Sequence, residues 1–427
     1  MSRIVIYGRG KTGQALMSLA NKEGKTAVFY DDVTGFDDGG DFCKSDVVLL
    51  SPGVPPFAKG RKRAKKVGTQ IVSEHEYCFC RCASKIVSVT GTNGKTTTCE
   101  MIHKILGAKS VLLGNGGTPF SSAIGNLSAE QIVVLESSSF QLADVKTFAP
   151  YVSVVTSVGC DHINYHGSEY AYKKAKTNNF IRQSKTDFAL FNCDDCGSLA
   201  MASMSQATTL FYSASNKYAN CYFDGECVAI NIGGSTEKAE APYLNGWYEH
   251  NVCNACGAIL AAVVCGCDFS FAAQSLKDYS FLPHRLQVVG NIGSVRFVDD
   301  SKATNVHATL AAIKSVKGNV ALIVGGSDKG ESFDGLFKNM PNSVVGVFAV
   351  GATANKICQC ATGYAFSVRV YDELRDVVRA AYSLAKKYES CTVLMSNACA
   401  SFDKYHGYDQ RGEHFCRCVA EIADETK

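Results

Sequence analysis

Short apolar runs alternate with amphipathic segments along most of this chain, a pattern that is typical of α/β proteins. The runs at residues 86–89, 132–135 and 152–157 are mainly apolar, as expected for parallel strands that are covered on both faces. Further strands are predicted at residues 4–7, 26–30, 46–50, 296–298, 321–324, 345–350 and 392–395. Helices are predicted at residues 14–21, 59–66, 74–80, 251–267 and 271–279. The fold class that we expect is therefore α/β.

The predicted strands and helices fall into three consecutive segments, and 427 residues are too many for one ordinary core. We therefore expect three α/β domains, at residues 1–84, 85–280 and 281–427. The first is predicted to be Rossmann-like, the second to be a P-loop ATPase-type domain, and the third to be Rossmann-like again. Ser73 and Glu76 have the spacing of a capping box, which would begin the helix at residues 74–80.

The composition narrows the class of protein. Apolar residues make up 46% and charged residues 19% of the chain, which is typical of a globular protein and excludes a disordered one. The net charge of +3 is too small to indicate a nucleic-acid partner. The sequence does not begin with a secretory signal, and the longest apolar stretch, residues 255–267, is too short to cross a bilayer. We expect a cytoplasmic monomer that does not insert into a membrane.

Twenty cysteines raise the alternative of a thiol-rich metal-binding or scaffold protein. Cys193 and Cys196, and likewise Cys253 and Cys256, have the spacing of metal-ligand pairs. The second pair lies in an apolar helical stretch, whereas zinc sites are built from short polar turns. Cysteine in a reducing compartment mostly acts as a small apolar residue, so we expect thiols and no structural metal. A metal assay on purified protein would separate the two interpretations.

The stretch Thr90–Thr98, with the sequence TGTNGKTTT, carries the most chemical information. It follows an apolar run and precedes a helical pattern, so a strand would end in a glycine-rich turn that opens a helix. Such a turn directs backbone N–H groups at an anion. Lys95 could then reach the β- and γ-phosphates, and the Thr96 hydroxyl could bind Mg²⁺. The predicted nucleoside triphosphate site comprises Gly91, Thr92, Asn93, Gly94, Lys95, Thr96 and Thr97.

A second glycine-rich turn lies near the start of the chain, where Gly8, Gly10 and Gly13 follow a short predicted strand. The acidic pair Asp31 and Asp32 ends the next predicted strand, about twenty residues later. By itself this dinucleotide fingerprint favours an oxidoreductase that uses NAD. The phosphate loop argues against that alternative, because no cluster in the sequence suits hydride chemistry. A binding titration of NADH against UDP would distinguish the two.

Polar side chains follow other predicted strands, at the sheet edge where ligands bind in open parallel sheets. Glu136 and His162 each stand just after such a strand and could supply ligands to the magnesium of a bound triphosphate. Lys302 and Lys329 follow strands of the third segment, where cations could hold a carboxylate substrate. Lys176 lies in the helical stretch YAYKKAK, and the pattern alone favours a solvated helix face for it.

Taken together, these motifs resemble the Mur ligase family. The resemblance rests on Thr90–Thr98, Asp161-His162, the stretch 282–285, the DSKATN motif at 300–305 and the ACAS motif at 398–401. It spans all three segments, in order and with matching spacing. The phosphate loop is shared with folylpolyglutamate synthetase, whereas the short first domain and the DSKATN motif resemble the D-glutamate-adding member.

The resemblance implies an ATP-dependent amide ligase of peptidoglycan synthesis. The carboxylate of UDP-N-acetylmuramoyl-L-alanine would attack the γ-phosphate to give an acyl phosphate, and the amine of D-glutamate would then displace phosphate. ATP and two Mg²⁺ ions would be the cofactors. The alternative is another Mur-type or folylpolyglutamate-type ligase with a different amine acceptor.

The same resemblance implies roles for residues of all three segments. Lys95, Glu136, His162 and Lys176 would be catalytic. Thr96 and Glu136 would bind the first magnesium, and His162 with a carbamylated Lys176 would bind the second. Beyond the phosphate loop, ATP would contact Asn254, Arg285 and Asp300. The UDP moiety would contact Thr12, Asp31, Asp32, Ser51 and Gly53, and the rest of that substrate Asn115 and Ser138. D-glutamate would contact Lys302, Thr304, Lys329, Ser401 and Tyr408.

Overall fold

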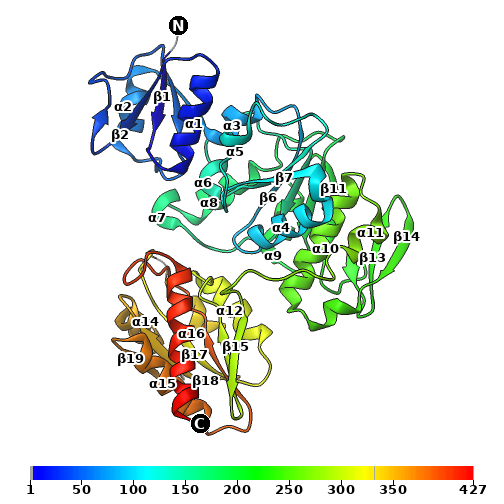
Figure 1. Ribbon diagram of the computed structural model, residues 1–427, viewed down its shortest axis with the longest axis vertical. Coiled ribbons are helices and arrows are strands. Elements are labelled where there is room, and N and C mark those ends of the chain that lie inside the picture. The colour runs from blue at the N-terminus through cyan, green and yellow to red at the C-terminus, as the bar shows by residue number, and fades with distance from the viewer. Residues whose placement is uncertain (1–2, 331, 365, 427) are drawn as a thin grey trace. The chain divides into compact units, whose positions relative to one another are not determined.

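The computed structural model describes residues 3–330, 332–364 and 366–426, and it confirms an α/β protein built on three sheets (Figure 1). The chain divides into two compact units. The first comprises the residues up to Cys160 together with Tyr165–Tyr279, and the second comprises Asp161–Asn164 together with Ser280 and the residues that follow it. Two of the three sheets lie in the first unit and one lies in the second.

The first sheet has the strand order β3-β2-β1-β4-β5. Its strands are β1 (Ile4–Tyr7), β2 (Ala27–Asp31), β3 (Gly35–Phe36), β4 (Val47–Leu50) and β5 (Gln70–Ser73), and its helices are α1 (Lys11–Lys22) and α2 (Lys59–Val67). All neighbours pair in parallel except β2 and β3. Successive side chains of a strand point to opposite faces. Accordingly, Ile4 and Ile6 pack in one core cluster with Leu16 of α1, and Val5 packs in another with Ala64 of α2.

The central sheet has nine strands in the order β14-β13-β12-β11-β10-β9-β6-β8-β7. They are β6 (Lys85–Thr90), β7 (Ser110–Gly114), β8 (Ile132–Glu136), β9 (Val152–Val155), β10 (Phe188–Asn192), β11 (Thr208–Tyr212), β12 (Cys221–Phe223), β13 (Cys227–Ile232) and β14 (Ser235–Glu240). β12 to β14 form an antiparallel extension of an otherwise parallel sheet.

Helices connect the first two sheets and follow the central strands. They are α3 (Glu74–Phe79), α4 (Lys95–Leu106), α5 (Phe120–Ala123), α6 (Ser139–Leu142), α7 (Ile163–His166), α8 (Glu169–Thr177), α9 (Cys196–Ala202), α10 (Glu249–Val264) and α11 (Phe269–Gln274), with 3-10 turns at Gly107–Lys109 and Pro242–Gly246. α10 is buried along most of its length, as its apolar sequence predicts.

The third sheet, in the second unit, has the order β15-β16-β20-β17-β18-β19. Its strands are β15 (Gln287–Ile292), β16 (Val295–Asp299), β17 (Asn319–Val324), β18 (Val344–Val350), β19 (Val368–Tyr371) and β20 (Cys391–Met395). Its helices are α12 (Val306–Ser315), α13 (Asp334–Lys338), α14 (Ala354–Ala361), α15 (Leu374–Ala385) and α16 (Tyr408–Glu425). Only the edge strand β15 runs antiparallel to its neighbour. α15 and α16 cover one face of this sheet with a shared apolar core.

The predicted strands are present, but β3, β5, β7, β10 to β15 and β19 were not predicted. The capping box was half right. The Ser73 hydroxyl accepts from the Glu76 amide, as predicted, whereas the Glu76 carboxylate accepts from the amides of Lys146, Thr147 and Phe148. That carboxylate therefore ties α3 to the loop that precedes β9 of the central sheet.

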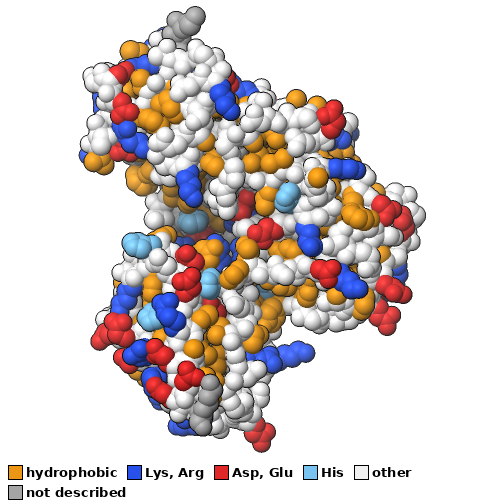
Figure 2. Space-filling model, viewed as in Figure 1, with side chains coloured by type: hydrophobic (Ala, Val, Ile, Leu, Met, Phe, Trp, Pro, Cys, Tyr) orange, Lys and Arg blue, Asp and Glu red, His pale blue; other side chains and the backbone are white. Residues whose placement is uncertain are grey.

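The distribution of surface charges and the state of the cysteines are those expected from the composition. On the face shown in Figure 2, basic and acidic side chains are interspersed. The twenty cysteines all lie in the described part of the chain and are thiols, as predicted. Within the described residues, none of the helices combines the length and the apolar character needed to span a bilayer.

Candidate active site

The phosphate loop connects β6 to α4, as the sequence predicts, and close contacts hold its shape. The Thr92 amide donates to the Ser157 carbonyl at 2.6 Å. Gly94 has φ = +87°, and a Cβ there would lie 2.7 Å from Oδ1 of Asn254. A Cβ on Gly91 would lie 1.9 Å from the Thr156 hydroxyl. Glycine is therefore required at both positions, and α10 places Asn254 against the loop.

Two lysines converge on one carbonyl of this loop. Lys95 folds back so that its Nζ donates to the carbonyls of Gly91 and Thr92, both at 2.9 Å. Nζ of Lys176 donates to the same Gly91 carbonyl at 2.6 Å and lies 4.6 Å from the centre of the Tyr172 ring. The Gly91 carbonyl of the phosphate loop therefore accepts hydrogen bonds from a lysine of α4 and from a lysine of α8.

The interpretation of Lys176 as a solvated helix residue is wrong. Its side chain is 1% exposed, because the face of α8 that also carries Tyr172 and Ala175 packs into the first unit. A buried amine next to a phosphate loop can react or bind a ligand, whereas a solvated one would carry no such implication.

The side chains of Glu136 and Thr96 both lie close to Gly116, where there is little room for a side chain. A Cβ on Gly116 would lie 2.4 Å from Oε2 of Glu136 and 3.5 Å from Cγ2 of Thr96. Asn115 donates to Oε1 of Glu136 at 3.1 Å. The buried carboxylate at the end of β8 is thus held beside the first turn of α4, and a hydroxyl and a carboxylate oxygen are ligands that Mg²⁺ prefers.

His162 is placed differently from the other predicted magnesium ligands. Thr96, Glu136 and Lys176 belong to the first unit, whereas His162 belongs to the short segment that packs with the second. In that segment Asp161 is buried, accepts from the side chain of Asn305 at 3.1 Å and lies 3.5 Å from Nζ of Lys329. Within the described residues there is no cluster of three or more His, Cys, Asp or Glu side chains that could hold a metal by itself.

At the carboxyl edge of the first sheet, the predicted UDP contacts Thr12, Asp31, Asp32, Ser51 and Gly53 follow strands or begin α1. Asp32 is engaged locally, since its carboxylate accepts from the amides of Lys59 and Gly60 at the start of α2. Burial would raise the pKa of Asp32, but hydrogen bonds from those amides and from the Tyr30 hydroxyl outweigh it and lower the pKa. Ser51 donates to the Gly8 carbonyl of the glycine-rich turn.

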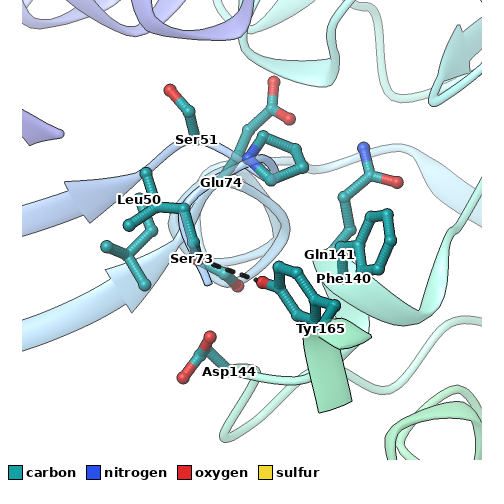
Figure 3. A pocket seen from close by; sticks show the side chains of 10 residues that line it. Leu50, Ser51, Ser73, Glu74, Phe140, Gln141, Asp144 and Tyr165 are labelled. Atoms are coloured by element: carbon teal, nitrogen blue, oxygen red, sulfur yellow. Dashed lines mark hydrogen bonds between the residues drawn. The ribbon is translucent and has the colours of Figure 1, made fainter. Parts of the chain in front are cut away.

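A small pocket lies between this edge and the residues around α6 and Tyr165 in the same unit (Figure 3). Ser51 and Glu74 line it from the first sheet side, and Gln141 and Tyr165 line it from the central side. The Tyr165 hydroxyl donates to the Val54 carbonyl at 3.1 Å. The predicted contact Ser138 is adjacent, because it caps α6 and accepts from the amide of Gln141.

Glu74 was not singled out in the sequence, although it lines the pocket. Its Oε1 accepts from the amide and the hydroxyl of Ser121, and burial raises its pKa. Its one signal in the sequence was its place as the first residue of the predicted helix at residues 74–80.

In the second unit, loops after three strands bring together most of the predicted amino-acid contacts. Nζ of Lys302 lies 3.9 Å from the centre of the Tyr408 ring. Nζ of Lys329 donates to the Thr304 carbonyl at 3.0 Å. Ser401 is buried in the loop after β20.

The predicted ATP contacts Arg285 and Asp300 also lie in the second unit. Asp300 accepts from the Ser396 hydroxyl at 2.7 Å and from the Leu286 amide at 3.3 Å. Burial raises the pKa of Asp300 to about 7, while the hydrogen bonds and the charge of Arg285 oppose that rise. Arg411, a buried cation that binds the same loops, was not singled out in the sequence analysis.

Known families match most of the chain. Residues 89–262 match the Mur ligase middle domain, and residues 284–398 match the Mur ligase, glutamate ligase domain. The UDP-N-acetylmuramoylalanine--D-glutamate ligase of Caldicellulosiruptor saccharolyticus is 32% identical in an alignment that covers 98% of this chain and 99% of that protein. The chain belongs to the Mur ligase family.

Other Mur ligases agree with this placement. The UDP-N-acetylmuramoylalanine--D-glutamate ligase of Alkaliphilus oremlandii is 33% identical over 88% of this chain and 84% of that protein. The crystal structure of MurF ligase from Thermotoga maritima in complex with ADP aligns with a TM-score of 0.58, over 90% of this chain and 97% of that one. At 18% identity it shows that the Mur ligase fold is shared. The resemblance drawn from the motifs is confirmed, and the oxidoreductase interpretation of the first glycine-rich turn finds no support.

Proposed function

We propose that this Mur ligase joins D-glutamate to UDP-N-acetylmuramoyl-L-alanine and cleaves ATP to ADP and phosphate. The observation that carries the proposal is the alignment, over nearly the whole length of both chains, with a relative named for that reaction. The order of sites along the chain supports the proposal. The first glycine-rich turn suits the UDP substrate, the phosphate loop suits ATP, and the lysines that follow strands of the third sheet suit D-glutamate.

ATP would bind at the phosphate loop with its γ-phosphate near Lys95. The loop presents a helix N-terminus that no side chain caps, and such a terminus attracts anions. Lys95 would leave the carbonyls of Gly91 and Thr92 for the phosphates, where its charge stabilises the transferring phosphoryl group. The ADP bound to a MurF of the same fold supports a nucleotide in this family. Asn254, Arg285 and Asp300 would complete the ATP site.

Magnesium fits the oxygen ligands that the chain offers. The Thr96 hydroxyl and the Glu136 carboxylate would hold one ion, and His162 with a carbamylated Lys176 would hold a second. When bound, the ions would neutralise charge between the phosphates and the substrate carboxylate. Asn115 orients Glu136 for this role through its hydrogen bond.

Carbamylation of Lys176 is supported by its burial. Carbon dioxide reacts with the neutral amine, and burial in general favours the neutral form of a lysine. The product is an anionic oxygen group, which a nearby divalent metal stabilises. The second cation at the Gly91 carbonyl, Lys95, would favour the anionic product in the same way.

The two acid substrates would bind to residues from different parts of the chain. Thr12, Asp31, Asp32, Ser51 and Gly53 would bind the UDP moiety, and Asn115 and Ser138 the remainder. D-glutamate would bind Lys302, Thr304, Lys329, Ser401 and Tyr408, because a dicarboxylate needs cations and hydrogen-bond donors. Reaction requires the carboxylate, the γ-phosphate and the amine in line, so positioning supplies much of the rate. Because ATP and UDP-linked precursors are cytoplasmic metabolites, we place the reaction in the cytoplasm. A monomer is the expected state.

The experiment that tests the function is phosphate release with UDP-N-acetylmuramoyl-L-alanine and a panel of acceptors. D-glutamate should be used, and D-alanine, L-glutamate, L-lysine and diaminopimelate should be used at least about a hundredfold less well. D-alanine and L-lysine leave a cation without a carboxylate, L-glutamate misplaces the amine, and diaminopimelate has a more distant second carboxylate and an added ammonium. A preference for lysine or diaminopimelate would assign the chain to another Mur-type activity. Omitting the UDP substrate is the control for unproductive ATP cleavage.

A further inference from the structure

Arg411 is a buried side chain in the first turns of α16, and all of its donors are used. The side chain is 3% exposed. Its Nε donates to the Ser301 hydroxyl at 2.9 Å, and its Nη2 donates to the carbonyls of Ser301 at 2.8 Å and Cys399 at 3.1 Å. Its Nη1 donates to the carbonyls of Ala400 at 3.2 Å and Gly325 at 3.3 Å. A guanidinium has five N–H donors, and these bonds engage five acceptors.

The acceptors belong to three loops that are far apart in the sequence. Ser301 follows β16, Gly325 follows β17, and Cys399 and Ala400 follow β20. The same loops carry the proposed acceptor contacts: Lys302 and Thr304 follow β16, Lys329 follows β17, and Ser401 follows β20. One rigid, planar cation therefore sets the spacing of the whole group.

The surroundings of the guanidinium leave little room for an altered geometry. A Cβ on Gly326 would lie 2.8 Å from Nη1 of Arg411 and 2.1 Å from the Ala400 carbonyl. The Ser301 hydroxyl, which accepts from Arg411, donates to the Tyr408 carbonyl at 2.8 Å. The loops are packed around Arg411 and tied to the start of its own helix.

The charge of Arg411 also has no counterpart among its acceptors, which are all neutral oxygens. Burial lowers the pKa of Arg411 to about 10, so the side chain still carries its charge at neutral pH. The carboxylates of Asp403 and Asp299 act on Arg411 in the opposite direction to burial, so its charge is partly balanced by groups that it does not hydrogen-bond.

We propose that Arg411 is the positioning residue that sets the affinity of this enzyme for its acceptor amino acid, a proposal that rests on the proposed function. It does not touch the substrate. It holds the loops so that Lys302, Lys329 and Ser401 meet both carboxylates of one small molecule. Lysine keeps the charge but has three donors, so Arg411→Lys leaves at least two of the five acceptors without their partner.

The test compares steady-state constants of the wild type, Arg411→Lys and Arg417→Lys. Arg417 lies on the same helix and is exposed, which makes it the matched control. Arg411→Lys should raise KM for D-glutamate about tenfold or more, as expected when one or two hydrogen bonds that hold a site are lost. KM for the UDP substrate should change less than about twofold, and Arg417→Lys should behave as the wild type. Ser301→Ala, which removes a single acceptor, should raise KM for D-glutamate by a smaller factor and serves if Arg411→Lys does not fold.

The outcomes separate this proposal from the proposed function. If the folded Arg411→Lys variant keeps the wild-type KM for D-glutamate, or loses kcat with all KM values unchanged, Arg411 is a general structural residue and the proposal is overturned. If the wild type itself rejects D-glutamate, the proposed function fails. The positioning role is then judged, by the same ratio of KM values, on the amino acid that the wild type accepts.

Discussion

Two lysines of α8 look alike in the sequence and differ in the structure. The side chain of Lys173 is 42% exposed and pairs with Glu169, one turn earlier on the helix. Lys176 is buried and donates to the Gly91 carbonyl, 85 residues away in the sequence. A helical pattern reports which residues share a face, but it does not reveal a long-range partner. Lys176 therefore lies buried against the phosphate loop and not on the surface, where the helical pattern had placed it.

Replacing Lys176 should separate a carbamate from an ammonium. Lys176→Ala should lose about a hundredfold or more in turnover while staying folded, because an anionic metal ligand is missing. Short carboxylic acids should restore part of the activity by filling the ligand position. Lys176→Arg should stay inactive, since a guanidinium cannot be carbamylated. Lys173→Ala is the matched control and should be near wild type; an active arginine variant would contradict the carbamate.

The burial of His75 leads us to expect that the free energy of unfolding of this protein depends on pH. Its Nε2 lies 3.1 Å from the Ser137 hydroxyl, its Nδ1 has no hydrogen-bond partner among the described residues, and burial lowers its pKa to about 3. The unfolded chain therefore takes up this proton first as the pH falls. The stabilising contribution is fully present above the unfolded pKa, near 6.5, and is lost progressively toward the folded pKa, by about 1.4 kcal/mol for each pH unit.

Urea unfolding at pH 7 and pH 5 tests this linkage. The free energy of unfolding of the wild type should fall about 2 kcal/mol more over this interval than that of His75→Phe, which cannot titrate. Phenylalanine suits the site because His75 already packs against the rings of Phe120 and Phe148. Replacing the exposed His406 by Gln is the control and should leave the wild-type dependence. Equal pH dependence in His75→Phe and the wild type would show that His75 is accessible to protons in the folded state.

At the scale of elements, local signals in the sequence predicted where helices begin, but not which distant residues their side chains bind. The spacing of Ser73 and Glu76 correctly placed the start of α3. It could not show that the Glu76 carboxylate binds amides some seventy residues later. The phosphate loop was predictable for the same reason, because strand, glycine turn and helix follow one another directly. The contact of Gly94 with Asn254 was not.

Asp32 gives a test of such a helix start. Its carboxylate accepts from the Lys59 and Gly60 amides, so Asp32→Ala should lower the free energy of unfolding by about 1–2 kcal/mol through the lost cap of α2. Asp31→Ala is the neighbouring control; the Asp31 carboxylate accepts from the Val33 amide, two residues away, so its loss should cost less stability. Denaturant titration measures both. Equal stability of the two variants would leave Asp32 as a substrate contact alone.

At the scale of the whole molecule, the strands at the centre of each sheet were mostly predicted and the sheet margins were not, although β10, a buried parallel strand between β9 and β11, was missed. The apolar runs predicted β6, β8 and β9 because both faces of those strands are covered. Edge strands such as β14 and β19 carry exposed polar positions and give weak patterns. The cations after strands of the third sheet, which we propose as the acceptor site, could be singled out in the sequence, whereas Arg411, which binds those loops from a helix, left no pattern.

The central claim is that the ATP site activates a carboxylate as an acyl phosphate, which D-glutamate then displaces. An isotope transfer measures this directly. UDP-N-acetylmuramoyl-L-alanine labelled with ¹⁸O in its carboxylate is incubated with ATP, Mg²⁺, D-glutamate and the enzyme, and the released phosphate is analysed by mass. The carboxylate oxygen that attacks phosphorus leaves with the phosphate when the amine attacks carbon, so each phosphate should carry one ¹⁸O atom. Phosphate without ¹⁸O, formed together with the amide product, would contradict the account.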